Sequence, residues 1–157
     1  RNEYKSMGTT YTFPQLAEYA RIVGEFPARI NVNDDCFLAP DSMITEIKEY
    51  CRRTHQAVPE SVGEICSLIY HGLASCYAKA ISFIEAQTGK NLSGIYVVGG
   101  GCQDLYLNEL TAKYSGKQVF AGPIEATAMG NLAAQMIAGG ELKDVAHVRE
   151  IISSYCS

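Results

Sequence analysis

The C-terminal half of the chain is centred on the stretch Ile95-Tyr-Val-Val-Gly-Gly-Gly-Cys-Gln-Asp-Leu105. Its first four residues are apolar or aromatic β-formers without polar alternation, which predicts a strand buried on both faces, as in a parallel sheet. The three glycines that follow allow a sharp turn and leave no side chain between the backbone and a ligand. Gln103 and Asp104 are then expected in the first turn of a helix, where backbone N–H groups are unpaired.

This order of strand, glycine turn and helix is typical of a nucleotide site, but three glycines also occur in plain turns. From the residues alone, an anion such as phosphate would lie at the helix N-terminus, because the helix dipole is positive there. A nucleotide site and a bare turn therefore both remain open at this point.

The rest of the chain is predicted to be mostly helical, because capping residues and apolar residues at i, i+3, i+4 spacing mark one segment after another. The longest helix starts at the capping box Ser61-Val-Gly-Glu64 and runs to about Thr88. The other predicted elements are helices over about 13–23, 43–51, 103–115, 125–138 and 145–153, and short extended segments at 29–32 and 118–121.

Two neighbouring residues stand out within the longest predicted helix. Gly72 lies mid-helix, where glycine costs about 1 kcal/mol relative to alanine, so we expect another element to approach the helix closely there. His71 could act as a general base, but a structural or solvent-facing histidine is the expected role.

The C-terminal half thus predicts a βαβα unit packed with additional helices, which is an α/β fold. The 157 residues are enough for one domain with a real core, and we expect a single domain over 1–157. Two strands do not make an independent sheet, so further strands are expected from chain outside this sequence or from a second copy. The isolated chain is accordingly expected to self-associate through an open sheet edge.

Composition and charge exclude several classes of partner. The net charge is −4 without clustered Lys or Arg, which argues against nucleic acid as a partner. The sequence contains no apolar run near the roughly 18 residues of a membrane span. We therefore expect a cytoplasmic protein that binds neither nucleic acid nor membrane.

Candidate metal ligands are scattered along the sequence. The six cysteines include no C-x-x-C pair and the three histidines lie far apart, so no zinc site is predicted and the cysteines are expected to be reduced core residues. Asp34 and Asp35 could bind a metal together, but adjacent carboxylates point in different directions, and a capping or turn role is expected instead.

Longer motifs connect these elements to a known family. The segments Val97-Val-Gly-Gly-Gly-Cys-Gln-Asp-Leu-Tyr-Leu-Asn-Glu-Leu110 and Val119-Phe-Ala-Gly-Pro-Ile-Glu-Ala-Thr-Ala-Met-Gly-Asn131 resemble the C-terminal domain of the FGGY carbohydrate kinases. Asn31-Val-Asn-Asp-Asp-Cys-Phe37, Pro40 and Pro59-Glu-Ser61 narrow the resemblance to members that phosphorylate L-rhamnulose. The resemblance covers nearly the whole chain from about Ala28.

The resemblance implies an actin-like, ribonuclease H-like ATPase fold, in which ATP and sugar bind in the cleft between two α/β domains. This chain would be a truncated part of the second, ATP-side domain, with the first domain absent. The implied reaction transfers the γ-phosphoryl group of ATP to the 1-hydroxyl of L-rhamnulose with Mg²⁺. Because the general base belongs to the first domain, we expect no catalytic residue here, and an isolated chain that is inactive and binds ATP weakly.

Within the glycine triplet, the ATP-binding glycine of the family matches Gly100, and Gly99 and Gly101 give the backbone room. The resemblance places these glycines against the adenosine of ATP rather than against its phosphates, and Gln103 could hydrogen-bond the adenine or ribose. Where Asp104 stands the family commonly has asparagine. A carboxylate accepts but does not donate a hydrogen bond, so helix capping is the expected role of Asp104.

Two other functions remain open. The chain could belong to another sugar kinase of the group, such as one for L-fuculose, because the first domain mostly sets the choice of sugar. It could also be a non-catalytic interaction domain on the same fold, since a fold does not determine a function.

Overall fold

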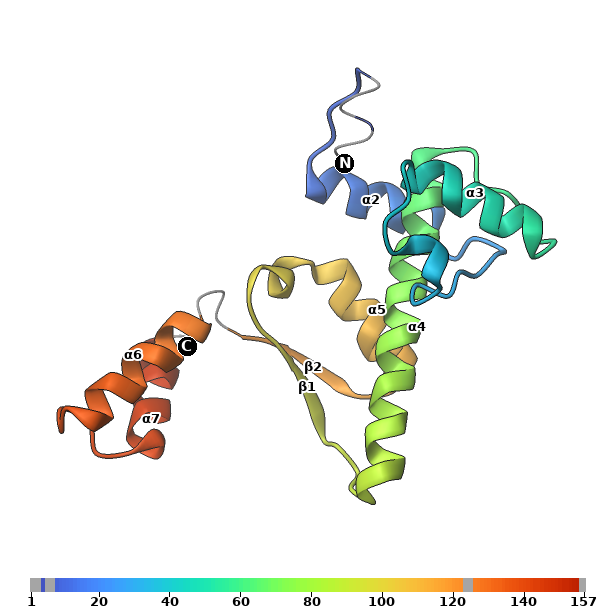
Figure 1. Cartoon of the computed structure of the whole chain (residues 1–157). Coiled ribbons are helices and arrows are strands. Elements are labelled where there is room, and N and C mark those ends of the chain that lie inside the picture. Colours follow the sequence, from blue (N-terminus) through green and yellow to red (C-terminus); the bar gives the residue numbers. More distant parts are fainter. Residues whose placement is uncertain (1–3, 5–7, 123–125, 156–157) are drawn as a thin grey trace. The chain divides into compact units, whose positions relative to one another are not determined.

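The computed structural model describes residues 4, 8–122 and 126–155 (Figure 1). The chain divides into two compact units, Arg1–Ile95 with Asp104–Phe120, and Tyr96–Gln103 with Ala121–Ser157. The elements in chain order are α2 (Phe13–Val23), the 3₁₀ turn η1 (Asp35–Phe37), α3 (Met43–Arg53), α4 (Val62–Thr88), β1 (Gly94–Val97), the 3₁₀ turn η2 (Gly100–Gln103), α5 (Leu105–Ser115), β2 (Gln118–Ala121), α6 (Ala126–Ala138) and α7 (Val145–Tyr155). Residue 125, the predicted start of α6, lies outside the described residues.

Side-chain caps set where the helices of the first unit begin, as predicted. Thr12 forms a capping box with Gln15 at the start of α2, and Ser61 forms one with Glu64 at the start of α4. Ser42 caps α3. Each cap satisfies backbone N–H groups that have no partner within the helix.

The long helix α4 carries the core of the first unit, and both α2 and α5 pack against it (Figure 1). Its buried residues all lie between Gly63 and Ala74. Beyond that point the apolar side chains of the helix are half-buried or exposed, with 42% of Tyr77 and 46% of Ile84 accessible to solvent. Two apolar clusters form the core: Leu16, Ala20, Cys66, Ala74, Tyr106 and Leu110, and Ala28, Ile30, Ile47, Cys51, Ile65 and Leu68.

Gly72 sits where the chain segment 30–32 crosses α4, as predicted from its mid-helix position. A Cβ atom on Gly72 would lie 2.9 Å from Cγ1 of Val32, 3.0 Å from Cγ1 of Ile30 and 3.3 Å from the carbonyl oxygen of Ile30. Real Cβ atoms rarely approach other atoms so closely, because protein interiors are close-packed. The absence of a side chain on Gly72 therefore allows the segment to lie directly on the helix.

The predicted extended segment at 29–32 forms no strand. The side chain of Gln56 takes the place of a neighbouring strand, because its Oε1 accepts the N–H of Arg29 at 2.7 Å and its Nε2 donates to the Arg29 carbonyl at 2.9 Å. The hydroxyl of Tyr50 accepts the N–H of Asn31, two residues further along the segment, at 3.3 Å. Side chains thus satisfy backbone groups that a sheet would otherwise pair.

Strands β1 and β2 pair in a two-stranded sheet. They run parallel, because Gly94 at the start of β1 lies beside Gln118 and Phe120, whereas the N–H of Gly122, just after β2, donates to the Val97 carbonyl at 2.7 Å. The prediction that β1 is buried on both faces is wrong, since Tyr96 is 74% exposed. Burial of both faces needs a layer on each side and neighbouring strands, and the described residues supply only two strands.

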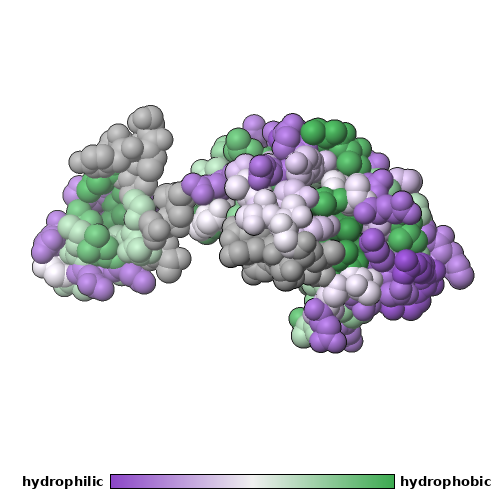
Figure 2. Space-filling model, turned by 90° about the horizontal axis from the view of Figure 1, so that it is seen from above, coloured by the Kyte–Doolittle hydropathy of each residue, from purple (hydrophilic) through white to green (hydrophobic). Residues whose placement is uncertain are grey.

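In the second unit, α6 and α7 pack against each other. Large apolar side chains reach the surface in both units, for example Phe83, Leu105 and Leu132, and Figure 2 shows hydrophobic residues (green) between hydrophilic ones (purple). Among the described residues, none of the helices combines the length and the apolar content that a membrane span requires.

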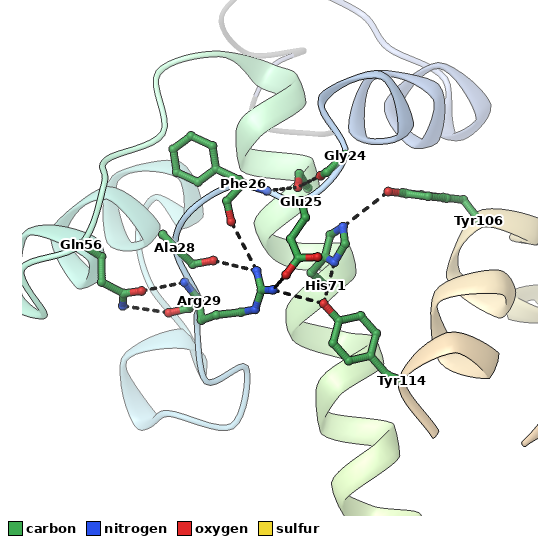
Figure 3. A network of polar contacts seen from close by, with 10 residues as sticks. Gly24, Glu25, Phe26, Ala28, Arg29, Gln56, His71, Tyr106 and Tyr114 are labelled. Atoms are coloured by element: carbon green, nitrogen blue, oxygen red, sulfur yellow. Dashed lines mark hydrogen bonds and ion pairs between the residues drawn. The ribbon is translucent and has the colours of Figure 1, made fainter. Parts of the chain in front are cut away.

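A partly buried polar network joins α4 to α5 and to the loop after α2 (Figure 3). His71, which is only 2% exposed, has its Nδ1 2.9 Å from the hydroxyl of Tyr114 and its Nε2 3.5 Å from that of Tyr106. Arg29 donates to the same Tyr114 oxygen at 3.3 Å and pairs with Glu25. His71 is thus a structural residue, as expected.

Burial lowers the pKa of His71, because the charged imidazolium loses its hydration inside the protein. The positive charges of Arg29 and Lys113 lower the pKa further, and the negative charge of Glu25 opposes them. His71 is therefore buried in its neutral form.

We predict that Gly72→Val destabilises the protein by about 1–3 kcal/mol, because the added methyl groups overpack the contact with Ile30 and Val32. The matched control is Gly130→Val in α6, where an added Cβ would meet no atom within 4 Å. The control should change the free energy of unfolding by less than about 0.5 kcal/mol. Urea unfolding measures both variants, and equal losses of stability would contradict a close approach at Gly72.

We also predict that stability falls as the pH drops below about 6.5, the ordinary pKa of histidine. The unfolded chain then binds a proton at His71 that the folded chain does not, so the free energy of unfolding decreases by up to about 1.4 kcal/mol per pH unit. Unfolding measured between pH 7.5 and 5.5 should show a smaller decrease for His71→Gln. An unchanged pH slope in this variant would show that His71 is not the group responsible.

Candidate functional site

The glycine turn between β1 and α5 is shaped by its own backbone. Gly99 has a φ of +78°, a left-handed conformation that side chains disfavour. The N–H of Cys102 donates to the Gly99 carbonyl at 3.0 Å, which closes the turn. Residues Gly100–Gln103 then form the 3₁₀ turn η2. The predicted sharp turn is therefore present, and Gly99 is the glycine whose conformation requires the absence of a side chain.

The same turn leaves open space beside its glycines. A Cβ atom on Gly99, Gly100 or Gly101 would meet no heavy atom within 4 Å. Gly100, Gly101 and Gln103 are exposed, whereas Cys102 between them is 5% exposed and so is turned inward. The turn thus presents bare backbone and one amide side chain to its surroundings, while Cys102 is buried.

Asp104 follows the turn and caps α5. Its Oδ1 accepts the N–H of Leu107 at 3.1 Å, and its backbone is not helical. The expectation that Gln103 and Asp104 lie in the first helical turn is wrong, because the capping residue stands just before the helix and α5 begins at Leu105. The predicted capping role of Asp104 is confirmed.

The cap also bears on the kind of ligand that fits near this helix end. The carboxylate of Asp104 already accepts one of the unpaired N–H groups of α5 and places a negative charge there. A phosphate at the same helix end would meet this charge. This helix end is therefore less favourable for the anion that the residues alone suggested.

The other candidates are structural or scattered. Asp34 caps η1 by accepting the N–H of Cys36 at 3.1 Å, and hydrogen bonds from Cys36 lower the pKa of Asp34. Five described cysteines are free, and Cys156 lies outside the described residues. Within the described ranges, His, Cys, Asp and Glu side chains form no group of three that could hold a metal ion.

One contact beside the turn is not predictable from the sequence. The hydroxyl of Tyr70 on α4 donates to Oδ2 of Asp104 at 2.6 Å, across 34 positions in the chain. No motif in the sequence marks Tyr70. Nothing in the sequence indicates that it meets Asp104, because the packing of α4 is a property of the folded chain.

The sequence of the chain is similar to the sequences of known proteins. The family model described as "FGGY family of carbohydrate kinases, C-terminal domain" matches residues 5–139. A rhamnulokinase of Bacillus subtilis is 49% identical over 142 residues, which cover 90% of this chain and 29% of that protein. Rhamnulokinases of Enterococcus faecalis and Lactiplantibacillus plantarum are 45% identical over 146 residues and 36% over 148 residues, covering 92% and 94% of this chain and 30% of each relative.

The chain spans about three tenths of the length of these relatives. The helix-rich structure with a small parallel sheet agrees with the predicted α/β class. Since the family model matches the chain over most of its length, the chain belongs to the FGGY family of carbohydrate kinases, to whose C-terminal domain it corresponds.

Proposed function

We propose that the chain is part of the ATP-side domain of a kinase that phosphorylates L-rhamnulose at its 1-hydroxyl, giving L-rhamnulose 1-phosphate and ADP. The proposal is carried by one observation: several proteins named rhamnulokinase are 36–49% identical to the chain over about nine tenths of its length. The open glycine turn supports a nucleotide-side role for this part of the enzyme.

In the proposed complex, the backbone at Gly99, Gly100 and Gly101 lies against the adenosine of ATP. The open space on the Cβ side of all three glycines fits this arrangement, because a flat purine nucleoside can approach bare backbone closely. The exposed amide of Gln103 can both donate and accept, so it suits the adenine ring or the ribose hydroxyls.

The remainder of the catalytic machinery is assigned to other parts of an actin-like, two-domain enzyme. Phosphoryl transfer depends on positioned phosphates, a metal ion and an oriented nucleophile. The glycine turn offers no general base, so we propose that this chain binds and orients the nucleotide while the sugar and the base lie elsewhere. The isolated chain is then inactive.

Mg²⁺ is the metal ion that we propose for the complete enzyme. The described residues do not by themselves fit a metal site, since they contain no cluster of three suitable ligands. In kinases, Mg²⁺ is commonly held by substrate phosphates with one or two carboxylates and several waters. We therefore assign the ion to the phosphates of ATP and to residues outside the described part of this chain.

We further propose a cytoplasmic location, which the free thiols of the five described cysteines support. Self-association of the isolated chain through an open edge of its two-stranded sheet stays a prediction, which sedimentation of that chain tests.

Gly100→Val in the complete enzyme is expected to raise the KM for ATP at least about tenfold, because the new side chain occupies the space assigned to the nucleoside. The KM for the sugar should change less than about twofold, so the sugar serves as an internal control. Steady-state kinetics with each substrate varied in turn measures both constants. Equal effects on the two substrates would count against the proposed nucleotide site.

The sugar assignment is tested by assaying the complete enzyme on L-rhamnulose and L-fuculose with ATP. We expect kcat/KM to be at least about a hundredfold higher for L-rhamnulose, since sites that hydrogen-bond a sugar discriminate strongly against misplaced hydroxyls. A preference for L-fuculose would indicate the other sugar kinase considered above. Phosphorylation of neither sugar would favour a non-catalytic interaction domain.

A further inference from the structure

Both carboxylate oxygens of Asp104 are used. Oδ1 caps α5 through the N–H of Leu107, and Oδ2 accepts the hydroxyl of Tyr70 at 2.6 Å. This O–H···O distance falls in the range of strong, charge-assisted hydrogen bonds. The residue that directly follows the glycine turn is therefore hydrogen-bonded to two helices, to α5, which it caps, and to α4, which carries the core of the unit.

Tyr70 is itself well placed to act as a fixed donor. Its ring packs against that of Tyr106, with the ring centroids 5.2 Å apart. Burial raises the pKa of Tyr70, and the hydrogen bond to Asp104 raises it further. The hydroxyl thus keeps its proton at neutral pH and remains a donor to Asp104.

We propose that Tyr70 and Asp104 form a positioning pair for the nucleotide-binding turn. The pair fixes the point at which the turn joins α5, and through it the affinity of the complete enzyme for ATP. This inference rests on the proposed function, because it assigns the pair to the turn at Gly100. Tyr70 contacts the carboxylate and not the nucleotide, so it is a positioning residue that acts through Asp104.

The pair depends on the chemistry of position 104. A carboxylate accepts from both the Leu107 N–H and the Tyr70 hydroxyl. Asparagine at this position could accept from Leu107 but would turn an N–H₂ donor toward Tyr70. The hydroxyl would then have to rotate and accept instead, with the loss of the charge-assisted bond.

The test is Tyr70→Phe in the complete enzyme, which removes one oxygen and keeps the ring packed against Tyr106. We expect the KM for ATP to rise about five- to tenfold, the size of effect that loss of a typical hydrogen bond produces. The kcat and the KM for the sugar should stay within about twofold. The matched control is Tyr77→Phe, since Tyr77 lies two turns further along α4 and is 42% exposed.

Two outcomes would overturn the inference. In the first, Tyr70→Phe has the same KM for ATP as Tyr77→Phe. In the second, Tyr70→Phe lowers kcat and thermal stability and raises both KM values together, which indicates a structural role only. Asp104→Asn should raise the KM for ATP as Tyr70→Phe does. The double variant should equal the larger single effect, because the two residues share one interaction, and additive effects would contradict the pair.

Gly100→Val separates this inference from the proposed function on which it rests. If Gly100→Val leaves the KM for ATP unchanged, the nucleotide site itself is wrong, and the assignment of the pair falls with it. If Gly100→Val raises the KM for ATP while Tyr70→Phe does not, the nucleotide site stands and only the positioning pair is wrong.

Discussion

Close packing around the first half of α4 is the constraint on which the first unit depends. Two glycines in this half, nine positions apart and therefore on opposite sides of the helix, allow other backbone to approach. A Cβ on Gly63 would lie 2.8 Å from Cγ2 of Val23 and 3.0 Å from the carbonyl of Tyr19, and Gly72 stands in the same relation to Ile30. Each glycine costs about 1 kcal/mol of helix propensity relative to alanine. The apolar contacts made across these two points offset that cost, because dispersion and burial grow with the number of close contacts.

Polar side chains of α4 form hydrogen bonds to groups that the apolar contacts leave without a partner. The loop after α2 has no strand partner, and Ser67, which is fully buried, donates to the Gly24 carbonyl and accepts the N–H of Phe26 at 3.3 Å. One turn later His71 links Tyr114 and Tyr106 of α5. No buried side-chain nitrogen or oxygen atom in the described residues lacks a hydrogen-bond partner. Such fully satisfied networks favour one arrangement of helices over others, because an unpaired buried polar group is costly.

The glycine turn differs from α4, because a hydrogen bond within the turn sets its conformation and its glycines carry no side chains. The bond from Cys102 to Gly99 closes it, and no side chain covers the backbone on the Cβ side. In the proposed kinase, this part of the chain contributes a surface for the nucleoside rather than a reacting group. The conformation and position of the turn then determine the affinity for the nucleotide. The hydrogen bonds of Asp104, at the point where the turn joins α5, are therefore expected to influence that affinity.

The sequence by itself determined the helices and the family, because these depend on signals within a few residues, such as the boxes at Thr12 and Ser61 or the glycine motif around Gly100. Only the tertiary structure decided the exposure of β1, the coil at 29–32 and the bonds of Tyr70 to Asp104 and of His71 to Tyr114. Those partners lie 34 and 43 positions apart in the chain. Helical periodicity states which residues share a face but not which side chain of another element meets them, since that is set by packing between elements.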